Sequence, residues 1–423
     1  MKRLSAILLA CILTLGLCSC ANNATPAATT LSSTSPTETV EGPKFSVPSP
    51  MAVPKYTLDP SATTDQLRQT AVQAMRDLLS IQWCTDIEIA YRKTGSVSQK
   101  HFKHLPNKTY AGTIYSNAAT GLFQFMEYYE QERGLFSFSE PVDVMKEKVG
   151  NSCADSLLWG WSSVCNSITG GFYYNAMVYS NGYLPVGGYT YNTDISSYMQ
   201  CPTNTIIEKN GTEKILECYT QVQMGDALVS STDKHAIMAI KDAHVAYKAD
   251  GTIDTTSSYI LIQDQRGGNG EGFYEQIKDG ETIRYSGRTS YSYTFKILLE
   301  KNYIPVTTAE FQGEKAYDQA TLDVSNEACG NINELQQITL SSNYPLAVIR
   351  LVATDETGTR TVLDRVLFSG ANDNGVPRTY ALADMESVMN LASNEQCKPG
   401  TTISIDVIVS TGDTFTPIEF PIA

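Results

Sequence analysis

Two segments of the chain carry apolar residues at the three-to-four spacing of an amphipathic helix. The first follows Thr63 and extends over residues 64 to about 80. The second follows Ser152, where Asp155 completes a capping box and makes Cys153 the first helical residue. We therefore expect two capped helices, and the apolar stripe of the second comprises Leu157, Leu158, Trp161, Val164, Cys165 and Ile168.

Beyond the second helix, short apolar runs separated by turn residues predict strands rather than long helices. A further helix is expected earlier in the chain, over residues 118–132. The Gly-, Tyr- and Asn-rich stretch 171–222 predicts long loops with short strands, which either shape a substrate groove or are ordinary surface loops. The expected strands are 226–230, 235–247, 258–265, 291–295 and 303–306, with a helical turn at 296–300.

From about residue 310 the pattern changes to alternating apolar and polar positions between Gly and Asp turns. Strands are expected at 346–353, 362–368 and 403–409. In the last of these, the odd positions are Ile or Val, whereas Ser404, Asp406 and Ser410 face the other way. The sequence thus predicts an α+β domain at 59–308 and an all-β, sandwich-like accessory domain at 309–423.

The N-terminal segment has the pattern of a targeting signal. Basic residues at positions 2 and 3 precede an apolar run, Leu4 to Leu17, which is too short to cross a membrane as a permanent helix. The run resembles a bacterial lipoprotein signal (1–19), which implies lipidation of Cys20 and an extracytoplasmic, membrane-anchored protein; an ordinary secretory signal is the alternative. Residues 20–58, poor in large apolar side chains, are expected to form a disordered tether.

Composition excludes several functional classes. The chain has 31 Lys and Arg against 45 Asp and Glu, a formal net charge of −14, which argues against binding nucleic acid through a basic surface. No phosphate-binding loop and no paired Cys-x-x-Cys spacing occurs. His101 and His104 are three residues apart, but no carboxylate or thiol stands at a suitable spacing beside them. We therefore expect neither a metal site nor a cofactor.

Cys153 is the leading candidate for chemistry. A thiol in the first turn of a helix faces unpaired backbone N–H groups and the positive end of the helix dipole, which favour the nucleophilic thiolate. We expect this side chain to be partly exposed. The alternative interpretation is a core cysteine that happens to begin a helix.

A cysteine nucleophile needs a base, and the base needs a group that orients its ring. His235 begins one expected strand, and the next strand ends in Gln263, Asp264 and Gln265. Side chains alternate across a strand, so only one of His235 and His244 can face the cysteine helix. We predict that His235 is the base and that Asp264 accepts a hydrogen bond from its ring, with Gln263 and Gln265 left open as alternatives.

The remaining cysteines allow disulfides in an extracytoplasmic chain. If Cys153 must stay free, six cysteines beyond the signal remain and permit 15 pairings. Position in the chain favours a Cys329–Cys397 bond and a Cys201–Cys218 bond. Cys165, on the apolar stripe, is expected to be a core thiol.

Four short blocks, in this order, resemble the bacterial cell-wall cysteine peptidases and amidases of the NlpC and CHAP type. They lie within residues 60–306 and are 112–115, 152–157, 225–229 with His235, and 260–265. The resemblance implies a papain-like fold and metal-free hydrolysis of amide bonds in peptidoglycan stem peptides. It also implies that Cys153 is the nucleophile, His235 the base and Asp264 the acid. Substrate contacts would come from Tyr115, Ser152 and Gln265.

Two departures from that family leave other functions open. NlpC enzymes usually have Asp-Cys-Ser at the nucleophile, whereas Ser152 and Ala154 flank the cysteine here, and residues 116–150 form a long insertion. A transglutaminase-like enzyme has the same Cys-His-Asp order, but an aromatic residue normally follows its His-Ala pair, and Ile237 stands there. The third possibility is a non-catalytic wall-binding lipoprotein that retains the fold.

Overall fold

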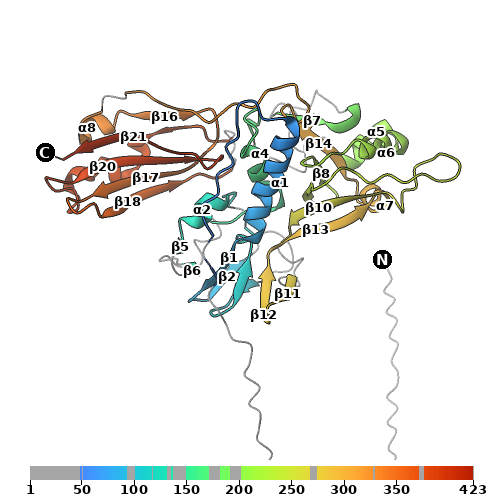
Figure 1. The fold of residues 1–423 in the computed structure, drawn as a ribbon, viewed down its shortest axis with the longest axis horizontal. Helices are drawn as coiled ribbons and strands as arrows, with labels where there is room; N and C mark the ends of the chain where they lie inside the picture. Colours follow the sequence, from blue (N-terminus) through green and yellow to red (C-terminus); the bar gives the residue numbers. More distant parts are fainter. Residues whose placement is uncertain are drawn as a thin grey trace, which may run out of the picture. The chain divides into compact units, whose positions relative to one another are not determined.

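A computed structural model describes most of the chain after residue 47 (Figure 1). The described residues belong to one compact unit, Pro43–Ala423. The fold is mixed α and β, with short helices and mostly antiparallel sheets, as the sequence pattern predicts at this level. The described ranges are 48–49, 51–92, 101–116, 118–130, 135–136, 149–170, 182–190, 202–266, 274–326, 329–370 and 376–422.

Both predicted capped helices are confirmed. Helix α1 (Thr64–Ser80) is capped by Thr63 and helix α4 (Cys153–Ser162) by Ser152, each with a complete capping box. The two helices contact each other, as Figure 1 shows near its centre. Helix α4 ends before the apolar stripe does, because Ser163 forms the C-cap. The Ser163 hydroxyl donates to the Gly160 carbonyl at 2.7 Å. The last three stripe residues are nevertheless buried behind it.

The sheet that carries the candidate chemistry has six strands in the order β13-β10-β9-β8-β14-β7. All of its pairings are antiparallel. Helices α1 and α4 contact β10, and α4 also contacts β9, so the helices position the cysteine against these two strands. The strands are β7 (Tyr183–Pro185), β8 (Ala227–Ser230), β9 (His235–Ala239), β10 (Tyr259–Gln265), β13 (Gly287–Thr294) and β14 (Ile304–Thr308), with the short helix α7 (Phe295–Glu300) before β14.

A second six-stranded sheet has the order β11-β12-β4-β1-β6-β5. Two of its pairings, β1 with β6 and β12 with β4, are parallel. A separate hairpin pairs β2 (Ile89–Arg92) with β3 (His101–His104). The strands of the second sheet are β1 (Gln82–Thr85), β4 (Thr109–Ala111), β5 (Tyr129–Glu130), β6 (Leu135–Phe136), β11 (Tyr274–Lys278) and β12 (Glu281–Tyr285).

The segment after residue 309 contains a four-stranded sheet, β18-β17-β20-β21, and a three-stranded sheet, β15-β16-β19. The three strands expected there are present as β17, β18 and β20. Their bounds are β15 (Leu322–Val324), β16 (Thr339–Ser342), β17 (Leu346–Thr354), β18 (Arg360–Leu367), β19 (Thr379–Ala381), β20 (Thr402–Val409) and β21 (Thr414–Pro421). The short helices are α8 (Ile332–Leu335), α9 (Glu386–Met389), η4 (Leu382–Asp384) and η5 (Leu391–Ser393).

Strand β20 departs from the expected division into a buried and a polar face. Ser404 and Asp406, expected to face outward, are 3% and 5% exposed. The Asp406 carboxylate is compensated by Arg360 at 2.6 Å and by the Thr416 hydroxyl at 2.9 Å. Both faces of this strand are therefore covered, and the buried Asp406 carboxylate has hydrogen-bond partners.

Several hydrogen bonds join the C-terminal segment to the chain just after α4. The Ser410 hydroxyl donates to the Ser162 carbonyl at 2.6 Å, and Arg378 Nη2 donates to the carbonyls of Asn166 and Ile168, both at 2.8 Å. The C-terminal segment thus supports the helix that carries Cys153, and the domain boundary at 308/309 stays a prediction.

Three element predictions are wrong. The helix expected at 118–132 is reduced to α2 (Leu122–Met126) followed by β5, because Ala119 has a positive φ of 53° that no α-helix accommodates. The strand expected at 235–247 ends at Ala239. Part of the loop expected at 171–222 forms the single turn η2 (Val186–Gly188) and the helices α5 (Thr203–Asn210) and α6 (Thr212–Thr220).

The end of the expected tether packs on the folded unit. Tyr56 is 4% exposed, and its backbone N–H donates to the Thr411 carbonyl at 2.8 Å. The Thr57 hydroxyl donates to Asp413 at 2.5 Å. The signal segment 1–19, Cys20 and the tether up to residue 47 lie outside the described residues. Among those that are described, no helix combines the length and apolar character needed to cross a membrane.

The disulfide predictions are not met. Cys329, Cys397 and Cys218 are all free thiols, so the expected Cys329–Cys397 bond is absent. Cys218 forms no bond with Cys201, which lies outside the described residues. Cys165 is fully buried, as expected for a core thiol, and burial raises its pKa well above the ordinary value for cysteine.

Candidate active site

Cys153 occupies the first position of α4, as its place directly after the N-cap Ser152 predicts. Asp155 Oδ2 accepts hydrogen bonds from the Ser152 backbone N–H at 2.9 Å and from its hydroxyl at 2.7 Å. These bonds fix the turn from which the thiol projects. The thiol is not partly exposed as expected, because only 2% of Cys153 is accessible.

A closed ring of buried hydrogen bonds holds this turn to β10. The Thr113 hydroxyl donates to Asn151 Oδ1 at 2.5 Å, and Asn151 Nδ2 donates to the Ser156 hydroxyl at 2.6 Å. The Ser156 hydroxyl donates in turn to Gln265 Oε1 at 2.5 Å, and Gln265 Nε2 donates to the Thr113 carbonyl at 2.9 Å. Since both polar ends of the fully buried Gln265 side chain are used here, its position fits a structural role better than the expected substrate contact.

The other two residues with predicted substrate contacts are Ser152, on the turn that carries Cys153, and Tyr115, on a segment that pairs with this turn. The backbone of Tyr115 forms a parallel bridge with Asn151, two residues before Cys153, and its side chain is half-buried. Ser152 is half-buried as the N-cap. The structure therefore brings the first two sequence blocks together at the N-terminus of α4.

His235 and Asp264 meet across adjacent strands. Nε2 of the His235 ring lies 2.6 Å from Asp264 Oδ2, and the two side chains are 5% and 0% exposed. Of the two alternatives to Asp264, Gln263 donates instead to the Val72 carbonyl at 3.0 Å, and Gln265 belongs to the ring described above. Asp264 is therefore the side chain of this strand end that contacts the histidine.

The electrostatics of His235 favour its protonated form. Burial lowers the pKa of the ring, but the charge of Cys153, the hydrogen bonds to Asp264 and Cys153, and the charge of Asp264 together raise it to about 9. Because Nε2 is engaged by Asp264, Nδ1 is the nitrogen left for the Cys153 thiol. The three side chains thus lie in the spatial order thiol, imidazole, carboxylate.

Three residues that the sequence did not single out surround the carboxylate. The Tyr291 hydroxyl donates to Asp264 Oδ2 at 2.7 Å, Arg266 Nε lies 3.2 Å from the same oxygen, and Arg288 Nε lies 3.4 Å from Oδ1. Burial raises the pKa of Asp264, but the hydrogen bond and charge of His235, the charge of Arg288 and the Tyr291 hydroxyl hold it below the usual value. Asp264 is thus kept as an ionised acceptor.

A sequence signal existed for one of these residues, but it was weak. Arg266 follows Asp264 by two residues, which places both on one side of an extended chain. Arg288 pairs with Asp264 across β10 and β13, but that register is irregular between Ile262 and Asp264. A local pattern contains no information about such a pairing.

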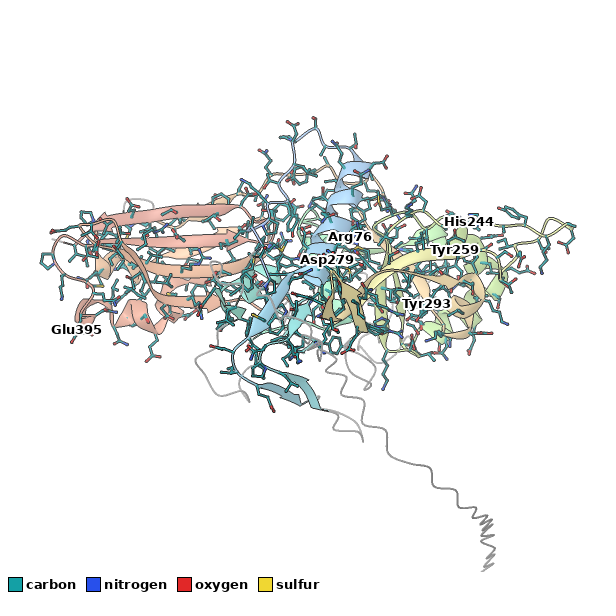
Figure 2. The ribbon with its side chains drawn as sticks, turned by 60° about the horizontal axis from the view of Figure 1, so that its bottom comes forward. Arg76, His244, Tyr259, Asp279, Tyr293 and Glu395 are labelled. Atoms are coloured by element: carbon teal, nitrogen blue, oxygen red, sulfur yellow. The ribbon has the colours of Figure 1, made fainter. Side chains whose placement is uncertain are left out.

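The remaining histidines are elsewhere. His244 lies outside β9 and pairs with Tyr259 through an isolated bridge, and the two rings make a tilted contact with their centroids 4.7 Å apart. Figure 2 labels both residues. His104 is 3% exposed between Trp83 and Tyr110, and burial lowers its pKa to about 3. Within the described ranges, no group of three or more His, Cys, Asp or Glu side chains could hold a metal ion.

The geometry supports nucleophilic catalysis. A thiol at a helix N-terminus, an imidazole beside it and a carboxylate behind the imidazole form an arrangement that can activate a nucleophile, because the imidazole can take the thiol proton and the carboxylate can orient the ring. In comparisons with known proteins, the chain matches no protein-family model, no curated protein and no solved structure.

Proposed function

We propose that this protein is a cysteine hydrolase that cleaves amide bonds, with Cys153 as nucleophile, His235 as base and Asp264 as the orienting acid. The 2.6 Å contact between His235 Nε2 and Asp264 at the N-terminus of the helix bearing Cys153 carries the proposal. We further propose a papain-like arrangement of helices on a sheet for residues 59–308 and an accessory β-sandwich for the remainder.

The proposed reaction is acyl transfer in two steps. His235 takes the thiol proton, and the thiolate attacks the amide carbonyl carbon, while backbone N–H groups at the helix N-terminus stabilise the negative oxygen. The tetrahedral intermediate collapses as His235 gives its proton to the leaving amine, which leaves a thioester on Cys153. Water, activated by His235, then hydrolyses the thioester and restores the thiol.

Peptidoglycan stem peptides are the substrate class we propose. The support is the order of the four sequence blocks, which resembles the cell-wall peptidases, together with the lipoprotein-like signal before Cys20. The acidic net charge of −14 is compatible with a peptide substrate and gives no support for nucleic acid.

A non-catalytic wall-binding role is the second candidate, and the burial of Cys153 and His235 favours it. Cys153 is 2% and His235 4% exposed, so a substrate could reach the sulfur only if the covering segments move. Reactivity of the thiol therefore separates the two functions more directly than binding does.

The deciding experiment combines iodoacetamide labelling, mapped by mass spectrometry, with muropeptide analysis. In the mature wild-type protein, we expect Cys153 to react faster than the half-buried Cys397, while the fully buried Cys165 stays unlabelled. Purified peptidoglycan should be cleaved by the wild type and left intact by Cys153→Ser. Cleavage that persists in Cys153→Ser would show that the nucleophile is wrongly assigned.

The control variant is Cys165→Ala, which removes a buried thiol that contacts the Thr308 hydroxyl at 3.4 Å but leaves the site untouched. It should cleave at the wild-type rate once its folded fraction is equal. If Cys153 reacts no faster than Cys397 and no muropeptide is released, the binding role replaces the hydrolase.

We also propose that the protein is held at the outer side of the cell membrane by lipid on Cys20. Cys20→Ser should move it from the membrane fraction to the soluble fraction or block its processing. Normal processing with unchanged membrane retention in that variant would contradict the lipid anchor and leave the hydrolase proposal untouched.

A further inference from the structure

Two opposing groups address the same nitrogen of His235. Nε2 lies 2.6 Å from Asp264 Oδ2, which can only accept a hydrogen bond, and 3.2 Å from Arg266 Nε, which can only donate one. A neutral imidazole nitrogen is either a donor or an acceptor, so it cannot satisfy both groups at once. The arrangement therefore forces a choice of tautomer.

The choice matters because Cys153 also interacts with the ring, and with Nε2 engaged by Asp264 the nitrogen left for the thiol is Nδ1. If Nε2 carries the proton and donates to Asp264, Nδ1 has a free lone pair and can take the proton of Cys153. If Nε2 instead accepts from Arg266, the proton resides on Nδ1, and the ring cannot act as a base toward Cys153.

In the intact protein, Nε2 of His235 donates its hydrogen bond to Asp264. Asp264 is closer to Nε2 than Arg266 is, and the guanidinium Nε–H has an alternative acceptor in the same carboxylate, 3.2 Å away at Oδ2. The contact between Arg266 and the ring is therefore an approach of two N–H groups that share one carboxylate oxygen, rather than a hydrogen bond between them.

Arg266 is held in this position independently of Asp264. Its Nη2 lies 3.1 Å from Asp233 Oδ2, and Asp233 also accepts from Lys301 Nζ at 3.0 Å and from the Tyr303 hydroxyl at 2.7 Å. Arg266 is 13% exposed, and Tyr303 is fully buried. Loss of the Asp264 carboxylate would therefore leave the guanidinium next to His235 with Nε2 as its nearest acceptor.

We propose that Arg266 is a positioning residue whose effect depends on Asp264. When the Asp264 carboxylate is present, Arg266 helps to orient that carboxylate. When the carboxylate is absent, Arg266 holds His235 in the unreactive Nδ1–H tautomer. The inference rests on the proposed function for its catalytic meaning, but the tautomer itself can be measured whether or not the protein is an enzyme. Two consequences follow. Removal of Asp264 should harm the site by more than the loss of one hydrogen bond, and removal of Arg266 should partly restore a protein that lacks Asp264.

The direct test is nitrogen NMR of the full mature protein labelled at its histidine side chains. The chain has only four histidines, and His235→Gln identifies the signals of interest. At a pH where the ring is neutral, the wild type should show the Nε2–H tautomer and Asp264→Ala the Nδ1–H tautomer. Asp264→Ala with Arg266→Met, which has no N–H at this position, should return to a mixture of both.

The functional readout is the rate of Cys153 alkylation by iodoacetamide, which needs no substrate. Asp264→Ala should slow it by about 10²–10⁴-fold. Addition of Arg266→Met should recover about tenfold or more of that loss, the value of a hydrogen bond to a charged group. The matched control, Arg284→Met, removes an arginine that pairs with the surface residue Glu275 at 3.1 Å and should recover nothing.

The possible outcomes separate this proposal from the proposed function. An Nε2–H tautomer in Asp264→Ala, or a double variant no faster than Asp264→Ala alone, would overturn the role of Arg266. If Arg266→Met does not fold, Arg266→Leu serves instead: it also has no N–H to offer the ring, and should give the same partial recovery. Absence of peptidoglycan cleavage together with the expected tautomers would reject the enzyme and keep the tautomer switch.

Discussion

Two buried aspartates in this protein, Asp264 and Asp226, have opposite electrostatic characters. Asp226 is 1% exposed just before β8, where Arg68 donates to Oδ1 at 2.7 Å and the Gln223 backbone N–H donates to Oδ2 at 2.8 Å. Asp264 is fully buried on β10 and is surrounded by His235, Tyr291 and two arginines. Each is the acid of a buried ion pair, so burial alone does not distinguish them.

The partners do distinguish them. Burial raises the pKa of Asp226 above the usual value even though the charge of Arg68 opposes it, whereas the larger set of donors lowers the pKa of Asp264. Arg68 also donates to the Met224 and Phe311 carbonyls, at 2.8 and 2.9 Å, so it ties three chain segments together. Asp226 thus belongs to a structural joint, whereas the partner of Asp264 is a titratable ring that contacts a thiol.

The largest expected effect comes from removing His235, the partner of Asp264. His235→Ala should reduce the rate of Cys153 alkylation and of any turnover by about 10²–10⁴-fold, because it removes the base. The matched variant His244→Ala removes a ring that stacks on Tyr259 and should leave both rates near the wild-type value. An equal loss in the two variants would mean that the sheet, rather than the ring of His235, controls the thiol.

Next in size is the structural joint. Arg68→Ala leaves the buried Asp226 carboxylate without its cation and should lower the free energy of unfolding by about 3–5 kcal/mol, measured by denaturant titration. Replacement of both partners by apolar residues, Arg68→Met with Asp226→Leu, should cost less than either single change. Under conditions where Arg68→Ala is folded, its Cys153 alkylation rate should equal that of the wild type, and a large fall would link the two sites.

The third prediction concerns pH. The pKa of His235 is raised from 6.5 to about 9 in the folded protein, so folding binds a proton between these values. The resulting stabilisation is complete below pH 6.5 and is lost as the pH rises through about 9, a decrease on the order of 3 kcal/mol in the free energy of unfolding. Denaturant titrations from pH 6 to pH 10 should show this decrease in the wild type and a much flatter curve in His235→Gln.

The smallest effect should come from Tyr291→Phe. The variant removes one 2.7 Å hydrogen bond to Asp264 but leaves His235 and both arginines in place. We expect a loss of about 1 kcal/mol, or roughly fivefold in alkylation rate. Tyr293→Phe, on the same strand but without a hydrogen bond to Asp264 among the described contacts, is the control and should show no change. A loss as large as that of His235→Ala would place Tyr291 in the chemistry itself.

Local sequence determined where the two helices begin and where Cys153 lies on the second of them. Both capping boxes, at Thr63 and at Ser152, join residues three apart, so the helices and the position of Cys153 follow from neighbours in the chain. Strand alternation allowed only one of His235 and His244 to face the cysteine helix, and the place of His235 at the strand start favoured it, although β9 ends at Ala239 and His244 lies beyond it. The helices α5 and α6 were missed because Gly, Asn and Thr around Gly211 resemble a loop more than two short helices.

Tertiary structure alone decided what surrounds the carboxylate. Asp264 contacts Arg288 and Tyr291 because β10 pairs with β13, and the irregularity of that pairing after Ile262 sets which side chains meet. The burial of Cys153 and the use of Gln265 in a hydrogen-bonded ring likewise depend on segments more than a hundred residues apart, such as Ser156 with Gln265. Hydrogen bonds within a turn can be read from residue order because the chain itself brings the partners together, whereas contacts between strands depend on a register that only the packed molecule fixes.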